Sequence, residues 1–360
     1  MTDNVKENRF VAFLKKKDII FSAKRYFVDA MGAMANGLFA SLLIGTIIST
    51  IGQRLNIAVL VDIGNFAKAV SGPAMAVSIA YALKAPALVL FSMLAVGQAA
   101  NTLGGAGGPL AVFFVSIIAT ELGKIVSKET KVDILVTPFV SIAGGVLLSM
   151  GCAPFIGKGA SLFGNLIMWA TEQHPFVMGI VVSVVVGVVL TLPISSAAIC
   201  AALSLTGLAG GAAVAGCSAQ MVGFAVMSYR ENKVGGLVSQ GIGTSMLQMG
   251  NIVKNPKIWI PPTLAAAITG PVATCLFKLQ MNGEAIASGM GTCGLVGQIG
   301  VYTGWLNDIS AGIKSSITAM DWIGLILISF VLPAVLSEVF CLVLRKIGWI
   351  KENDLKLDKM

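Results

Sequence analysis

The sequence contains very little charge. Charged residues make up only 12% of the 360 residues, whereas hydrophobic residues make up 56%. Soluble domains carry about 25% charged residues, so this composition excludes a water-soluble globular fold. The stretch from Ile134 to Tyr229 is the extreme case, because Lys158 and Glu172 are its only formally charged residues. The sequence therefore predicts an all-α, polytopic membrane protein.

The sequence also lacks the residue sets that metal or covalent chemistry requires. It has a single histidine, His174, and its six cysteines form no CxxC pair. A metal site needs several such ligands together, so we predict no metal site and no cofactor. The segment from Gly151 to Gly159 is not a nucleotide-binding loop, because a glycine follows Lys158 where serine or threonine is needed. No catalytic residue is predicted in this chain.

The charges that are present lie in short basic clusters between apolar runs, and they sum to a formal net charge of +8. This distribution follows the positive-inside rule of membrane proteins and does not indicate a nucleic-acid partner. It predicts that both termini are cytoplasmic, with residues 1–25 forming a basic arm and residues 346–360 forming a basic tail. The arm is either an amphipathic helix on the lipid surface or a solvated charged segment.

The apolar runs between these clusters predict about ten membrane crossings within residues 26–345, in a first part (about 26–155) and a second part (156–345). In the second part, we expect residues 156–171 to be a separate weakly apolar segment. We expect 193–206 to be a short crossing, one of three between Met150 and Tyr229. The expected apolar runs are 27–51, 57–83, 86–101, 109–120, 132–150, 156–171, 175–192, 193–206, 207–228, 263–279, 284–305 and 322–344.

Two segments, 239–262 and 284–305, do not fit a simple membrane helix. Each is rich in glycine and interrupted by polar residues, and the phrase from Gly241 to Thr244 is echoed from Gly289 to Thr292. Interrupted segments at corresponding positions mark binding sites in many transporters, although a short echo also arises by chance in a chain with 41 glycines. We predict two re-entrant hairpins, because irregular backbone at membrane depth must be surrounded by protein or a water-filled cavity.

Amides and hydroxyls in and near these segments are the candidate substrate ligands. Two of them, Ser195 and Ser196, follow a proline break, and they either line a site or bond back to their own helix. No arginine lies within the apolar crossings, so the candidate site suits a neutral polyhydroxy solute better than a carboxylate. The candidates are Thr244, Ser245, Gln248, Asn251, Asn255, Thr292, Gln298, Gln98, Asn101, Ser195 and Ser196.

The phrase from Asn255 to Pro262 resembles the Asn-Pro…Ile-Pro segment of IIC subunits of the bacterial phosphoenolpyruvate-dependent phosphotransferase system (PTS), glucose superfamily. Length and hydropathy are similar to its IIC-like, PfoR-type group. The resemblance implies a homodimeric, elevator-type sugar permease of the bacterial inner membrane. Those relatives carry a sugar-binding carboxylate where this chain has Thr244 and Ser245. We expect no phosphoryl-carrying domain after the basic tail, so any phosphocarrier is expected to be a separate cytoplasmic protein. An enzymatic role stays open only as the membrane subunit of a sugar phosphotransferase.

Three functions remain open from the sequence. The first is transport of a neutral sugar or sugar-like solute. The second is a membrane-embedded sensor that controls a cytoplasmic regulatory protein through the basic arm. The third is ion-coupled secondary transport, for which Glu338, Asp62 or Asp321 would have to be the coupling carboxylate.

Overall fold

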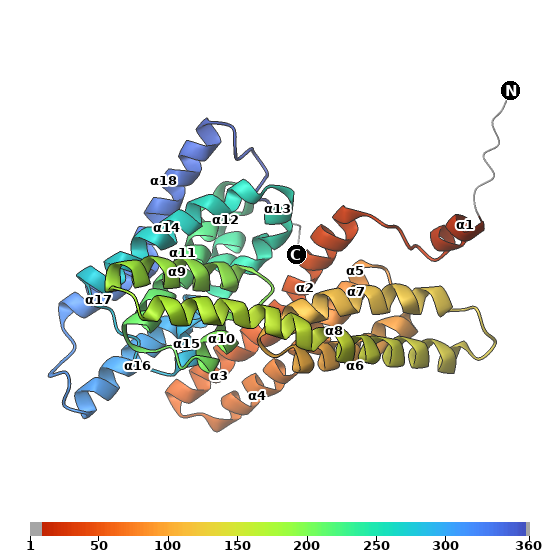
Figure 1. Cartoon of the computed structure of the whole chain (residues 1–360), viewed down its shortest axis with the longest axis horizontal. Helices are drawn as coiled ribbons and strands as arrows, with labels where there is room; N and C mark the ends of the chain where they lie inside the picture. The colour runs from red at the N-terminus through yellow and green to blue at the C-terminus, as the bar shows by residue number, and fades with distance from the viewer. Residues whose placement is uncertain (1–8, 358–360) are drawn as a thin grey trace.

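The computed structural model describes residues 9–357, and in that range the protein is built from helices without a β-sheet (Figure 1). The start of the predicted basic arm (1–8) and the last three tail residues (358–360) lie outside the described residues. The α-helices are α1 (Arg9–Lys16), α2 (Ala30–Leu38), α3 (Ile44–Leu55), α4 (Ala58–Ala69), α5 (Ser71–Ala82), α6 (Ala87–Gly104), α7 (Gly108–Val126), α8 (Asp133–Thr171), α9 (Pro175–Thr191), α10 (Ser196–Ala202), α11 (Gly207–Met227), α12 (Tyr229–Val238), α13 (Met249–Lys254), α14 (Ile260–Pro271), α15 (Ala285–Ser288), α16 (Val296–Ser310), α17 (Ala319–Ile326) and α18 (Leu332–Lys346).

Helix α8 runs along the molecule and joins two lobes (Figure 1). Its first part packs on α6 and α7, and its second part packs on α9 and α10. At 39 residues it is about 58 Å long. The expectation of a separate segment at 156–171 is therefore wrong, because the helix continues through Pro154 without a break.

Two helical hairpins and the first part of α8 build the first lobe. A continuous helical segment that begins at Arg25 and contains α2 and α3 packs against α4 and α5, and these two meet at a kink at Val70. Helices α6 and α7 pack on each other and reverse within Gly105–Gly107. Gly105 has φ = +52°, a conformation that glycine adopts without strain. This reversal falls between the expected runs 86–101 and 109–120, and it occupies fewer residues than the gap between them.

The second lobe is organised around α11, which is almost entirely buried by α9, α14 and α18. Small residues allow these helices to approach closely. A Cβ atom on Gly216 of α11 would overlap the carbonyl oxygen of Ser183 on α9, and one on Gly270 of α14 would overlap that of Gly179. Such contacts let membrane helices pack backbone to backbone. Van der Waals packing then stabilises the helix pair, because lipid provides no hydrophobic driving force for association.

Within residues 9–357, six helices are long and apolar enough to cross a membrane: Arg25–Gln53, Ala87–Val126, Asp133–Thr171, Gly207–Met227, Pro256–Leu276 and Ala319–Lys346. The expected count of about ten is not confirmed. The segment Ala87–Val126 contains the reversal at Gly105 and so comprises two antiparallel helices. Helix α10 has seven residues and spans only about 10 Å, so the expected short crossing at 193–206 is wrong.

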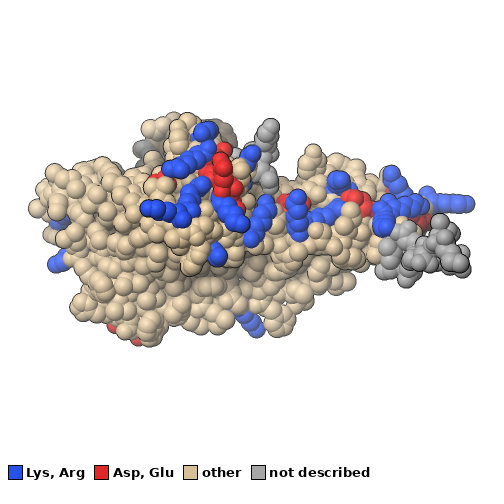
Figure 2. All heavy atoms as spheres, turned by 90° about the horizontal axis from the view of Figure 1, so that it is seen from above, with Lys and Arg blue, Asp and Glu red and all other residues tan. Residues whose placement is uncertain are grey.

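Lysine and arginine residues gather in a band along one side of the molecule, here called the basic face (Figure 2). The N-terminal arm is attached there, where Lys17 pairs with Glu129 and Lys124 donates to the backbone oxygen of Asp18 at 2.8 Å. Arg25 donates to the Asp18 carboxylate at 2.7 Å, and this hydrogen bond holds the pKa of Asp18 below its ordinary value. The arm includes a short helix, α1, which bears Lys15 and Lys16 in its last turn.

We expect Gly216→Ala to lower the melting temperature of the purified protein in detergent, because the new methyl group would push α9 away from α11. Overpacking of this kind costs about 1–3 kcal/mol or more. Gly159→Ala is the matched control, since that glycine lies in α8 with open space beside it and should tolerate the same methyl group. Equal melting temperatures for the two variants would contradict this account of the α9–α11 contact.

Candidate functional site

The chain from Tyr229 to Asn255 forms a hairpin, here called the first hairpin, that starts and ends at the basic face. Its two arms contact the same C-terminal segment: Asn232 donates to the backbone oxygen of Leu355 at 2.8 Å, and Asn255 donates to that of Trp349 at 3.0 Å. Between these points the chain passes through a π-helical turn, extended Thr244 and a short 3₁₀ helix. The hairpin ends earlier than the predicted 239–262, because Pro256–Leu276 forms the next long helix.

A second hairpin, from Asn282 to Asp308, also closes on itself. The side-chain amide of Asn282 donates to both carboxylate oxygens of Asp308, at 3.1 and 3.0 Å, and Asn307 donates to the Asn282 backbone oxygen at 3.3 Å. Between them lie α15, a tight turn at Cys293–Leu295 and α16. Gly294 and Leu295 in this turn have positive φ values, which allow the sharp reversal.

The tips of the two hairpins meet at a small pocket of about 60 Å³. Three predicted site residues reach it from separate parts of the chain: Thr244 from the first hairpin, and Ser195 and Ser196 from the start of α10. Gly289, Met290 and Cys293 of the second hairpin complete one side. The remaining lining residues are Leu38, Leu42, Leu43, Pro109, Leu190, Ile194, Ala197, Gly243 and Met246.

The hydroxyl groups of the pocket hold its walls in place. Ser196 donates to the backbone oxygen of Gly289 at 2.6 Å and so ties α10 to the second hairpin. Ser195 and Thr244 each accept a backbone N–H, from Ala198 and Met246 respectively, both at 3.1 Å. Since a hydroxyl can donate as well as accept, Ser195 and Thr244 keep a donor for a bound solute.

Ser245, next to Thr244, does not line the pocket. Its hydroxyl is fully buried and shares a 2.8 Å hydrogen bond with Thr191. Thr191 also bonds the Gln220 side-chain oxygen, which accepts from the Trp259 indole at 3.0 Å. The Gln220 amide donates in turn to Thr263 at 3.2 Å. This buried network fixes the first hairpin against α9, α11 and α14.

Gln220 is a residue that the sequence reasoning missed, although a signal was present. It is the only amide side chain in α11, a helix that contains no charged residue. A buried amide in such a helix must find partners from other helices, because each unsatisfied polar group costs free energy. A lone glutamine in a charge-free crossing was therefore a sign of a network at that point.

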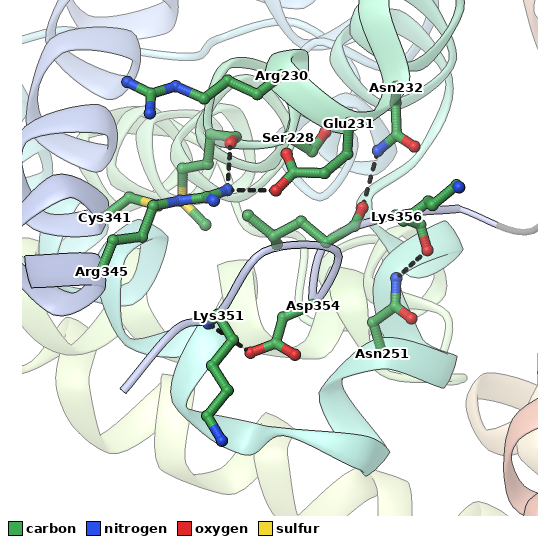
Figure 3. A network of polar contacts seen from close by, with 12 residues as sticks. Ser228, Arg230, Glu231, Asn232, Asn251, Cys341, Arg345, Lys351, Asp354 and Lys356 are labelled. Carbon is green, nitrogen blue, oxygen red and sulfur yellow. Dashed lines mark hydrogen bonds and ion pairs between the residues drawn. The ribbon is translucent and has the colours of Figure 1, made fainter. Parts of the chain in front are cut away.

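Three predicted ligands, Gln248, Asn251 and Asn255, bind the chain's own C-terminal segment. Gln248 donates to the Leu355 backbone oxygen at 2.9 Å, and Asn251 donates to the Lys356 backbone oxygen at 2.9 Å, as Figure 3 shows for Asn251. Asn255 also donates to the Asp354 carboxylate at 2.7 Å. These amides serve the packing of the hairpin, and they do not line the pocket between the tips.

The other predicted ligands also lie away from the pocket. Thr292 donates to the sulfur of Met221 at 3.5 Å, and Gln298 donates to Ser218 at 3.2 Å while its own side-chain oxygen is buried without a partner. Gln98 is exposed on α6 and bonds Thr102. Asn101 packs beside the glycine turn between α6 and α7.

The three candidate coupling carboxylates are absent from the pocket lining. Glu338 lies 3.9 Å from Arg230 at the basic face. Asp321 pairs with Lys314 at 2.7 Å and caps α17. Asp62 is exposed on α4.

Comparison with known proteins identifies the family. The model of the family described as "Phosphotransferase system, EIIC" matches residues 28–357. No curated protein matches the chain. The matched region contains both hairpins and every residue of the pocket between their tips.

Replacing Gln220 with leucine should destabilise the protein by about 1–3 kcal/mol, because the half-buried Trp259 indole N–H loses its acceptor, whereas Thr191 keeps its hydrogen bond to Ser245. A thermal unfolding experiment on the purified protein measures this loss. Gln98→Leu is the control, since that glutamine is exposed on α6. A Gln220→Leu variant as stable as the control would show that the network does not hold the hairpin.

Proposed function

The chain belongs to the EIIC family of the phosphotransferase system, and we propose that it carries a neutral sugar or sugar-like solute across a bacterial cytoplasmic membrane. The family supports sugar transport by a multi-pass membrane permease, and the long apolar helices agree with that role. The identity of the solute and the transport mechanism are parts of the proposal.

The observation that carries the proposal is the meeting of the two hairpin tips at the pocket of Thr244, Ser195 and Ser196. One hairpin leaves from the basic face and the other closes at the Asn282–Asp308 contact, at the far end of α14. Paired broken segments that meet inside a membrane protein are typical of transporter substrate sites. The lining is mainly apolar and contains three hydroxyls and no carboxylate, which suits an uncharged solute.

A topology with eight crossings accounts for the arrangement. Eight helical segments would each pass between the two faces: α2–α3, α4–α5, α6, α7, α8, α11, α14 and α17–α18. Three further segments, α9–α10 and the two hairpins, would each enter and return on the same face from which they start. The even number places both chain ends on the basic face, which the positive-inside rule assigns to the cytoplasm. In this topology both hairpins are re-entrant.

Transport requires the pocket to change shape. At about 60 Å³ it is far smaller than the 300–1,000 Å³ of typical small-molecule sites. The described conformation is therefore occluded, and a sugar would enter only after a hairpin moves or one lobe shifts along the other. An elevator-type shift of the second part (156–345) against the first (26–155), in a homodimer with lipid around it, is the mechanism we propose.

Energy coupling is proposed to come from a separate cytoplasmic phosphocarrier. An ion-coupled cycle would need a titratable group that senses the solute, and Glu338, Asp62 and Asp321 all lie outside the pocket. A sensor role would depend on the basic arm, which is bound to the first lobe through Lys17 and Asp18. Uptake into liposomes, with and without phosphocarrier proteins and ion gradients, separates these possibilities.

We expect purified protein to show a thermal shift with at least one member of a panel of sugars, polyols and sugar phosphates. Thr244→Ala should weaken that binding by about 1–3 kcal/mol, because it removes a buried hydrogen-bond donor. Ser161→Ala removes an exposed hydroxyl from α8 and should leave the affinity unchanged. A panel without any shift, or a Thr244→Ala affinity equal to that of the control, would contradict the proposed site.

A further inference from the structure

The C-terminal segment Trp349–Leu357 is held by four side-chain amides of the first hairpin, here called the amide cluster: Asn232, Gln248, Asn251 and Asn255. Figure 3 shows the contacts of Asn232 and Asn251. Asn232 holds it twice, donating to the Leu355 backbone oxygen and accepting from the Leu357 N–H, both at 2.8 Å. Gln248, Asn251 and Asn255 add the further hydrogen bonds described above. These side chains donate to peptide carbonyl groups, so the amide cluster has the chemistry of a peptide-binding site.

Apolar contacts of the segment with the first hairpin add to these hydrogen bonds. Leu355 is fully buried and Ile350 is 2% exposed, in the same apolar cluster as Leu247, Met249 and Ile252 of the first hairpin. The residues between them, from Lys351 to Asn353, are exposed. The alternation of buried and exposed positions shows that the segment binds through a few anchors, with Leu355 the most deeply buried.

The first hairpin is strained next to this contact. Lys233 has φ = 53° and ψ = −150°, a backbone conformation almost confined to glycine, and it follows Asn232 directly. Such strain costs on the order of 1–3 kcal/mol and persists only where the surroundings impose it. The two hydrogen bonds of Asn232 to the tail are interactions that could impose it, and loss of the tail would free the base of the hairpin to relax.

The segment also borders the space between the lobes. Leu357 helps to line a cleft of about 390 Å³, together with Gly250 and Lys254 of the first hairpin. Val28, Asp29, Gly32, Ala33, Asn36, Tyr81 and Ala82 form its opposite wall, from the first lobe. The tail therefore lies beside the first hairpin, at the cleft that separates this hairpin from the first lobe.

We propose that Trp349–Leu357 is a removable latch, bound as a peptide ligand by the amide cluster of its own chain. While seated, it fixes the arm of the first hairpin that carries Gln248 and Asn251, and Thr244 and Met246 in the same hairpin keep the pocket closed. When it leaves, the hairpin moves and the pocket opens toward the basic face. The inference rests on the proposed function only in taking this pocket as the solute site.

The native thiol of Cys293 reports this opening, because it lines the pocket and is 2% exposed. Full-length protein with Cys152→Ser and Cys275→Ser, which removes the two exposed thiols, is treated with N-ethylmaleimide. Peptide mass spectrometry then follows the rate of modification of Cys293. Leu355→Asp unseats the tail, and Asn353→Asp adds the same charge at an exposed tail position as a matched control.

We expect Leu355→Asp to raise the Cys293 rate about fivefold or more over the control, since a buried apolar anchor is lost. Cys217, which is fully buried in α11, should stay protected. Equal Cys293 rates in the two variants would overturn the latch, and so would an equal rise at Cys217, which indicates general unfolding. If Leu355→Asp does not fold, Asn232→Ala replaces it under the same criteria. The readout needs no solute, so a wrong substrate assignment would leave it unaffected.

Discussion

Irregular backbone inside a membrane protein depends on finding hydrogen-bond partners within the protein, and this constraint shapes the second lobe. Lipid offers no donor or acceptor, so each break in a helix has to be closed by side chains or by other backbone. Ser195, Ser196 and Thr244 do this at the pocket, and Gln220 of α11 is linked to the first hairpin through Thr191, which bonds Ser245. At the basic face, the amides of the hairpin take their partners from the C-terminal segment. The pocket exists because these partners hold several broken segments at one point.

The same constraint explains what could be predicted from the sequence. Composition alone specified an all-helical membrane protein, because low charge and long apolar runs allow no other class. The positions of both interrupted segments were visible as glycine and amide clusters, and the PTS resemblance was confirmed by the family match over residues 28–357. Ser195 and Ser196 were chosen because they follow a helix break and Thr244 because it lies in an interrupted segment, and all three line one pocket.

Features that depend on distant partners could not be read from the local sequence. Gln248, Asn251 and Asn255 have the residue types of sugar ligands, but their amides bind the tail about one hundred residues further along the chain. Nothing in the local sequence distinguishes a peptide carbonyl from a sugar hydroxyl as the partner of an amide. The continuity of α8 through Pro154 was also hidden, since a proline in a membrane helix can either end it or be accommodated by its surroundings. The close packing at Gly216 and Gly270 could not be predicted from the local sequence either, because it depends on the position of α9 as well as on α11 and α14.

The length of α8 ties the arrangement of the lobes to the bilayer. A straight helix of about 58 Å fits within a hydrocarbon core of about 30 Å only if it is inclined by roughly 60° from the membrane normal. Most of its surface is apolar and exposed, as expected for a helix in contact with lipid. A thinner bilayer would require a greater inclination and a thicker one a smaller inclination, at a modest free-energy cost for each ångström of mismatch. Since the two halves of α8 pack on different lobes, a change in hydrophobic thickness would change the relative depth of the two lobes in the bilayer.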